Sequence, residues 1–325
     1  TIPSLIKMGF KVFVQSNAGI SSSYTDDDYK KSGAVISSKL NELYSKADLV
    51  VKVQRPSKQK KTDELKFLKN CNLITLLYEQ KFKTEFSSLK KLNINVFALE
   101  KMPRISRAQS MDVLSSQSNL SGYKAVIDAA SLFNKAFPLM MTSAGTVAPA
   151  KVLIIGAGVA GLQAIATAKR LGAVVSTFDV RASTKEQVES LGAKFIEVED
   201  KGDSGETSAG YAKEMSANYK KKQAKLLEDS IAKTDIVITT ALIPGKPAPK
   251  LITKKMVEKM KVGSVIIDLA SEFGGNCELT KHGETVDYKS KKIVGPKNLP
   301  STVSQDSSRL FAKNVINFLM NSCES

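Results

Sequence analysis

The chain has 325 residues, of which 42% are hydrophobic and 25% charged, a globular composition that excludes a disordered or collagen-like chain. The excess of 48 Lys and Arg over 32 Asp and Glu residues gives a net charge of +16. The basic clusters are short, scattered and free of interleaved aromatic residues, which predicts a solvated lysine-rich surface and no nucleic-acid partner. Three cysteines and one histidine, His282 in a polar stretch, argue against a disulfide scaffold, a metal site and most histidine-based catalysis.

The first third of the chain alternates short apolar segments with helical ones, a pattern typical of a parallel sheet covered by helices. The predicted strands are Phe10–Gln15, Ala47–Val53, Asn72–Leu77 and Asn93–Leu99, and the predicted helices include Asp26–Lys31 and Ser37–Lys46. A polar stretch of mixed charge follows over residues 103–123, and a long helix is expected from about Ser118 to Phe137.

Two uncharged runs, Phe137–Ala150 and Val152–Ala168, invite a comparison with membrane helices. Lys151 separates them, glycines and a proline interrupt them, and neither reaches the roughly 20 apolar residues that a span needs. No membrane span is predicted.

Beyond Lys151 the alternation predicts a doubly wound sheet of six strands with intervening helices. These strands are Val152–Ile155, Val174–Phe178, Lys194–Val198, Ile236–Thr240, Ser264–Leu269 and Lys292–Val294. An amphipathic helix over Ser307–Met320 is expected to return to the first domain. The predicted architecture is α/β, with two Rossmann-like doubly wound domains and a cleft between them: residues 1–116 with 297–325, and residues 117–296.

A glycine turn joins the first two elements of the second domain. Gly156, Gly158 and Gly161 have the spacing G-x-G-x-x-G, directly after a strand and directly before a helix. The first glycine permits a tight turn, the second lets a pyrophosphate approach the backbone, and the third allows close packing of helix and strand. This context predicts dinucleotide binding at the helix N-terminus.

An acidic residue strengthens that interpretation. Asp179 ends the next strand, 18 residues after Gly161, where a carboxylate accepts hydrogen bonds from the adenosine ribose and repels a 2′-phosphate. NAD is therefore favoured over NADP. Arg181 follows two residues later and leaves accommodation of a 2′-phosphate open.

Three further segments have both a functional and a structural interpretation. The glycine-rich stretch 200–211 is either a lid, with Tyr211 over a nicotinamide, or a surface insertion. The segment Thr239–Gly245 either leaves room for the nicotinamide or is an ordinary turn after a strand. Arg104, Arg107, Gln109 and Asp112 either bind a cofactor or belong to an interdomain linker.

The stretches Pro103–Tyr123, Gly156–Gly192, Gly210–Gln223 and Thr234–Asn276 resemble the NAD-binding domain (domain I, alpha subunit) of proton-translocating NAD(P) transhydrogenase. The segment RISRAQSMDVLSSQ, residues 104–117, is the most distinctive of them. This family is related in fold to alanine dehydrogenase.

The resemblance implies roles for individual residues. It implies that Arg104, Gln109 and Asp112 act at the nicotinamide, with Gln109 facing the partner domain. The implied NAD(H) contacts are Arg104, Ile105, Ser106, Arg107, Gln109, Asp112, Ser115, Gly156, Gly158, Val159, Gly161, Asp179, Val180, Arg181, Gly210, Tyr211, Gln223 and Leu242.

The resemblance also implies an assembly: a homodimer of NAD(H)-binding chains, a partner domain that holds NADP(H), and a membrane domain that translocates protons. The expected location is the face of the mitochondrial inner membrane or of another organelle membrane. The family's first strand precedes the position of Thr1, so the first sheet is expected to lack a strand.

An alanine dehydrogenase-like oxidoreductase, of alanine or opine type, is the alternative enzymatic function. A non-catalytic NAD-binding module that uses its basic surface for an acidic partner is the other class that the sequence leaves open. Alanine dehydrogenases use a lysine and a histidine on the first domain to hold and protonate substrate, and here Gln54 and about Tyr78 occupy those places. Direct hydride transfer between two nicotinamides releases no proton and suits a chain with one histidine.

Overall fold

The structure is a computed structural model and describes residues 1–59, 62–79, 82–198, 215–243 and 246–322. The predicted contacts Gly210 and Tyr211 lie outside these residues. The chain divides into two compact units, of which unit 1 comprises Thr1–Gln117 with Val303–Ser325 and unit 2 comprises Ser118–Thr302. The sequence predicts these two boundaries after residues 116 and 296.

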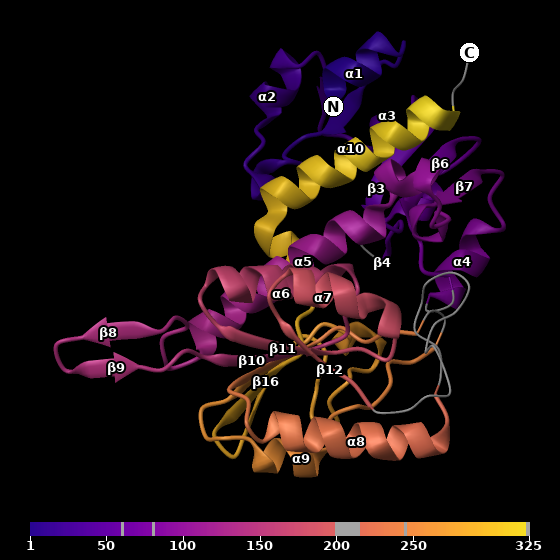
Figure 1. The fold of residues 1–325 in the computed structure, drawn as a ribbon. Coiled ribbons are helices and arrows are strands. Elements are labelled where there is room, and N and C mark those ends of the chain that lie inside the picture. The colour runs from indigo at the N-terminus through magenta and orange to yellow at the C-terminus, as the bar shows by residue number, and fades with distance from the viewer. Residues whose placement is uncertain (60–61, 80–81, 199–214, 244–245, 323–325) are drawn as a thin grey trace. The chain divides into compact units, whose positions relative to one another are not determined.

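Unit 2 contains one large sheet (Figure 1). Its strand order is β12-β11-β10-β13-β14-β16-β15. Every neighbouring pair is parallel except the edge pair of β15 and β16. Numbered from β10, the parallel strands have the order 3-2-1-4-5-6 of a doubly wound dinucleotide-binding fold, which confirms the predicted α/β class. The elements are α5 (Val113–Leu132, which begins in unit 1), β8 (Met140–Thr142), β9 (Gly145–Val147), β10 (Lys151–Ile155), α6 (Val159–Arg170), β11 (Val174–Phe178), η5 (Ala182–Thr184), α7 (Lys185–Ser190), β12 (Lys194–Ile196), α8 (Ala217–Ile231), β13 (Ile236–Thr239), α9 (Lys254–Lys259), β14 (Val265–Asp268), η6 (Ser271–Phe273), β15 (Thr285–Tyr288), β16 (Lys291–Val294) and η7 (Leu299–Val303).

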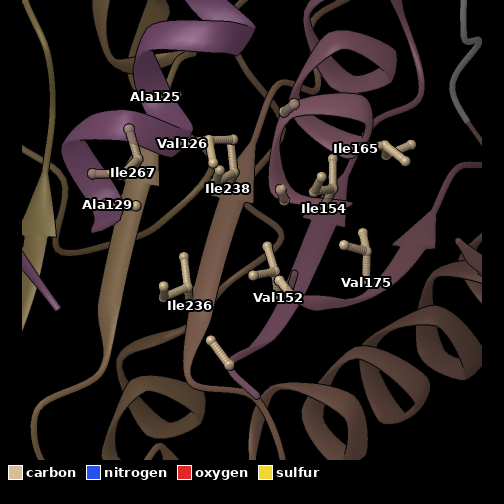
Figure 2. Packing of buried hydrophobic residues seen from close by; sticks show 14 of the residues in the cluster. Ala125, Val126, Ala129, Val152, Ile154, Ile165, Val175, Ile236, Ile238 and Ile267 are labelled. Atoms are coloured by element: carbon tan, nitrogen blue, oxygen red, sulfur yellow. The ribbon is translucent and has the colours of Figure 1, made fainter. Parts of the chain in front are cut away.

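Helices cover both faces of this sheet, α5, α6 and α7 on one side and α8 and α9 on the other (Figure 1). Because successive side chains of a strand point to opposite faces, each buried strand supplies both layers. Val152 and Ile154 join the cluster under α5 and α6, shown in Figure 2, whereas Leu153 and Ile155 join the cluster under α8 and α9. The carboxyl ends of the strands are thereby fixed between two apolar layers.

The long helix predicted over Ser118–Phe137 has both ends wrong, because it runs over Val113–Leu132. Its earlier start is fixed by the carboxylate of Asp112, which accepts hydrogen bonds from Ser115. The uncharged run that follows this helix contains an antiparallel hairpin of β8 and β9 that projects from the unit (Figure 1).

Asp235 ties the amino ends of two central strands together. Its buried carboxylate accepts the backbone N–H of Lys151 at 2.9 Å and the ammonium of Lys261 at 2.8 Å. Burial by itself would raise the pKa of Asp235, but the bonds from Lys261 and Lys151 outweigh it and lower that pKa below its ordinary value.

We expect Asp235→Asn to lower the free energy of unfolding at pH 7 by about 1–3 kcal/mol, because a buried charged hydrogen bond is lost. A folded pKa below the unfolded one stabilises above the unfolded pKa, and that stabilisation disappears as pH falls through the folded pKa. The difference from the parent should therefore shrink below about pH 4, as urea unfolding across pH would show. The exposed Asp229, paired with Lys225, provides a control, since Asp229→Asn should cost less than about 1 kcal/mol.

Unit 1 has a three-stranded parallel sheet, β3-β6-β7, and a separate parallel pair, β1 with β2. Its elements are α1 (Ile2–Lys7), β1 (Phe13–Gln15), η1 (Ile20–Ser22), α2 (Asp26–Lys31), β2 (Val35–Ser37), α3 (Leu40–Ser45), β3 (Leu49–Gln54), β4 (Lys58–Gln59), β5 (Thr62–Asp63), η2 (Glu64–Lys66), β6 (Asn72–Leu76), α4 (Lys83–Leu89), β7 (Asn95–Ala98), η3 (Leu99–Lys101), η4 (Ser106–Met111) and α10 (Ser304–Ser322).

The C-terminal helix α10 packs on unit 1, as the sequence predicted. Phe311, Val315 and Leu319 form one apolar face and enter a cluster with Ile74 of β6 and Leu99 of η3. Each such buried side chain contributes about 1.5–3 kcal/mol. None of the helices within the described ranges is both long and apolar enough to cross a bilayer.

Candidate functional site

The glycine turn between β10 and α6 has the geometry that the sequence predicts. Gly156 has a φ of +104°, a conformation that favours glycine, and a Cβ on Gly161 would lie 1.8 Å from the carbonyl oxygen of Gly156. A Cβ on Gly158 would meet no atom within 4 Å. Gly158 is the N-cap of α6 and gives it no side-chain cap, so the N-terminus of α6 has room beside it for an anionic group.

Asp179 at the end of β11 bonds directly to this turn. Its buried carboxylate accepts the backbone N–H of Ala157 at 2.6 Å and that of Arg181 at 2.9 Å. The Arg181 guanidinium binds the same carboxylate in a fork, through Nε at 2.9 Å and Nη2 at 2.8 Å. The structure therefore brings together the predicted ribose acceptor and the glycine turn, and it adds an ion pair that the sequence did not predict.

The segment after β13 completes this group from the next strand of the sheet. The hydroxyl of Thr240 donates to the carbonyl of Gly156 at 3.0 Å. The fully buried amide of Asn276 accepts from the Ala241 N–H at 3.1 Å and donates to the carbonyls of Ala241 and Pro249, each at 2.9 Å. Sequence reasoning missed Asn276, because its partners lie far away along the chain and no local pattern marks it.

Asp268 at the end of β14 is, after Asn276, a second buried hydrogen-bonding residue that the sequence did not predict. The carboxylate is fully buried and accepts the hydroxyls of Thr239 at 2.9 Å and Thr280 at 2.6 Å, together with the N–H of Cys277 at 3.0 Å. Its position at the carboxyl end of a central strand was the available signal. Burial raises the pKa of the Cys277 thiol to about 11, which removes this cysteine as a thiolate nucleophile at neutral pH.

The remaining predicted contacts of unit 2 differ in exposure. Val159 and Val180 are half-buried, and Leu242, two residues after Thr240, is exposed. Gln223 lies on the buried face of α8, in the helical stripe that also contains Leu227. The first three are accessible to a ligand at the carboxyl end of the sheet, whereas Gln223 is 6% exposed.

The second predicted group lies in unit 1, on η4 and the turns around it. Asp112 accepts the backbone N–H of Ser115 at 2.9 Å and the Ser115 hydroxyl at 2.6 Å, so this carboxylate serves the start of α5. The other predicted members of the group are exposed: Arg104, Ile105, Ser106, Arg107 and Gln109. Among the side chains that the structure describes, no cluster of three or more His, Cys, Asp and Glu residues could hold a metal ion.

A doubly wound sheet, a glycine turn before an open helix N-terminus and an acidic residue ending the next strand define a Rossmann-type dinucleotide-binding protein. The chain belongs to the alanine dehydrogenase/PNT family: the family's N-terminal domain matches residues 1–121 and its C-terminal domain matches residues 125–325.

Individual relatives agree with this assignment. The chain is 56% identical over 325 residues to the first of the parts that form NAD(P) transhydrogenase subunit alpha in Rhodospirillum rubrum, covering 98% of this chain and 84% of that protein. A solved transhydrogenase from Sinorhizobium meliloti has a TM-score of 0.90 and 46% identity, covering 99% of this chain and 87% of that one. A solved L-alanine dehydrogenase, at 24% identity, shares the fold with a TM-score of 0.80 over 99% of this chain and 84% of that one. The resemblance to the transhydrogenase family is confirmed. The chain therefore belongs to a family of oxidoreductases with an NAD-binding fold.

Proposed function

We propose that this chain is the NAD(H)-binding component of a proton-translocating transhydrogenase. Its reaction is direct hydride transfer between NAD(H) on this chain and NADP(H) on a partner domain, coupled to proton translocation by a membrane domain. The observation that carries the proposal is the open N-terminus of α6 at Gly158, beside the buried carboxylate of Asp179. It occurs in a chain 56% identical to a component of a transhydrogenase alpha subunit.

The residues of unit 2 fit a dinucleotide. The space at Gly158 and the N–H groups of α6 suit a pyrophosphate, and Asp179 suits the hydroxyls of the adenosine ribose. By resemblance, Arg104, Gln109 and Asp112 of unit 1 orient the nicotinamide end. The exposure of Gln109 fits a residue that also faces a partner.

Hydride transfer from C4 of NADH to C4 of NADP⁺ moves one hydrogen with its electron pair, oxidises the first nucleotide, reduces the second and releases no proton. The chain therefore needs only to bind, orient and exclude water. No histidine is needed to transfer a proton in this reaction. The chain has one histidine, His282, whose ring contacts the hydroxyl of Ser271, and this hydroxyl donates to the carbonyl of Pro296.

The alternative function, an alanine dehydrogenase-like reaction, would need a group that protonates substrate. Lys52, the lysine nearest to Gln54, is held in unit 1 by an ion pair with Glu64. Burial favours the neutral acid of Glu64, but the bonds from Lys52 and Ser57 prevail and lower its pKa. This pair serves the fold of unit 1 and supplies no free lysine at the position of Gln54.

The test is a single turnover. The chain loaded with NADH is mixed with the NADP-binding domain of a transhydrogenase that carries NADP⁺, and NADPH formation is followed. Fast transfer supports the proposal. Tight NADH binding without transfer, together with turnover of pyruvate and ammonia, would establish the alternative.

Gln109→Asn should leave the NADH dissociation constant within about twofold while slowing single-turnover transfer by roughly ten- to hundredfold. The reason is that a shorter side chain disturbs alignment of the reacting carbons more than binding. The exposed Gln305 of α10 provides the control, because Gln305→Asn should change neither quantity. Equal transfer rates for both variants would remove Gln109 from the reaction.

The proposed partners include a second copy of this chain. The hairpin of β8 and β9 projects from unit 2 with Leu139 58% exposed and Met141 85% exposed, and an uncharged arm of this kind suits a protein interface. The proposed membrane domain places the chain at a membrane face. Its location at the mitochondrial inner membrane or at another organelle membrane stays a prediction.

A further inference from the structure

Helix α10 carries a buried polar side chain within its apolar face. Asn314 is 8% exposed and lies between Phe311 and Val315, both of which pack into the core of unit 1. Burying an amide is unfavourable unless its donor and acceptor are both satisfied, so its partners indicate why the residue is tolerated there.

Those partners lie on the segment that carries Gln109. The Asn314 amide donates from Nδ2 to the carbonyl of Ser110 at 2.8 Å, and its Oδ1 accepts the hydroxyl of Ser116 at 2.8 Å. Asn317, one helical turn away, donates to the same Ser110 carbonyl at 3.0 Å. Two amides of α10 thus bond to one backbone oxygen. That oxygen lies 204 residues before Asn314 and 207 residues before Asn317 along the chain.

This carbonyl belongs to the last turn of η4. The carbonyls at the end of a helix have no partner inside it, and 3₁₀ helices of this length are weak by themselves. Ala108 and Met111 anchor the buried side of η4, while Gln109 is exposed. The orientation of Gln109 therefore follows the backbone of η4, and the bonds to Ser110 fix that backbone immediately after Gln109.

We propose that Asn314 is a positioning residue for hydride transfer, which holds η4 through the Ser110 carbonyl and so sets the direction of Gln109. Asn317 is its auxiliary on the same oxygen. The inference rests on the proposed function, because Gln109 is given its role there. The Asn314 amide contacts neither nucleotide and acts on the reaction only through η4.

The test compares Asn314→Leu, which has a similar volume and cannot bond, with Asn321→Leu on the same helix. Asn321 is exposed, and its amide donates to the carbonyl of Asn317 within α10. In the nucleotide-free chain, amide hydrogen exchange over residues 106–112 should accelerate roughly tenfold for Asn314→Leu and remain unchanged for Asn321→Leu. Exchange in the β6 strand should stay at the parent rate and report an intact unit 1.

With the NADP-binding domain present, Asn314→Leu should slow single-turnover transfer roughly tenfold while the NADH dissociation constant stays within about twofold. Asn317→Ala removes only the auxiliary bond from a half-buried position. It should give a smaller change in the same direction, which keeps the test available if Asn314→Leu does not fold.

Unchanged exchange over residues 106–112 in a folded Asn314→Leu or Asn317→Ala chain would overturn the proposal. So would faster exchange with an unchanged transfer rate. If the parent chain itself transfers no hydride, the proposed function fails, and the exchange measurement still decides whether α10 holds η4.

Discussion

Replacing Gly161 by alanine is expected to damage both the fold and nucleotide binding. The new Cβ would lie 1.8 Å from the carbonyl oxygen of Gly156 and 2.9 Å from its carbon, and backbone atoms of a tight turn cannot yield as a flexible side chain can. Either α6 or the turn must shift, at a cost of about 1–3 kcal/mol or more. Because this shift moves the N-terminus of α6, NADH affinity should fall at least about a hundredfold.

Gly158→Ala separates the two effects. Its Cβ meets no protein atom within 4 Å and its φ of −78° is open to any residue, so stability should change by less than about 1 kcal/mol. NADH affinity should still fall at least about tenfold, because the methyl group occupies the space left for the pyrophosphate. Urea unfolding and NADH titration of both variants measure the pair. Undiminished NADH affinity in Gly158→Ala would place the phosphates elsewhere.

The elements that were predicted correctly are those whose signal is local. The buried strands β10, β11, β13 and β14 are runs of β-branched and apolar residues bounded by turns, and the glycine turn follows β10 directly. The missed strand β15 is half-polar: Val286 and Tyr288 face the core, while Thr285 and Asp287 are exposed at the sheet edge. An alternation over only four residues is too short a pattern to predict a strand from the sequence.

The same difference separates the predicted and missed parts of the site. Gly156, Gly158 and Asp179 are marked by spacing within one βαβ unit, so sequence alone locates them. Asn276 and Asn314 act through carbonyls 35 and 204 residues away, and only the folded chain brings those partners together. Such long-range amides have no signature in composition or periodicity.

The ion pair of Arg181 with Asp179 bears on the choice between NAD and NADP. The Arg181 guanidinium is bonded to the Asp179 carboxylate and is not arranged to receive a 2′-phosphate. We therefore expect the pair to favour a nucleotide that lacks one. We propose that Asp179 favours NAD in two ways: its carboxylate faces the ribose hydroxyls, and it holds the Arg181 guanidinium.

Asp179→Asn should weaken NADH binding by roughly ten- to hundredfold, since a charged acceptor is replaced by a neutral one. The same change should tighten NADPH binding, because Arg181 loses its carboxylate partner and can pair with the 2′-phosphate. Fluorescence titration with both nucleotides measures the reversal. Asp229→Asn, which removes an exposed carboxylate of the same unit, is the control for charge alone and should leave both affinities unchanged.

The role of Arg181 is isolated by a second substitution in the same background. In the chain with Asp179→Asn, adding Arg181→Ala should abolish the gained NADPH affinity and change NADH affinity little, because the neutral ribose does not need the cation. A gain that survives the loss of Arg181 would mean that another basic residue of this +16 chain receives the 2′-phosphate. No gain in the single variant would mean that the carboxylate selects NAD through the ribose alone, with the ion pair serving only to hold the turn after β11.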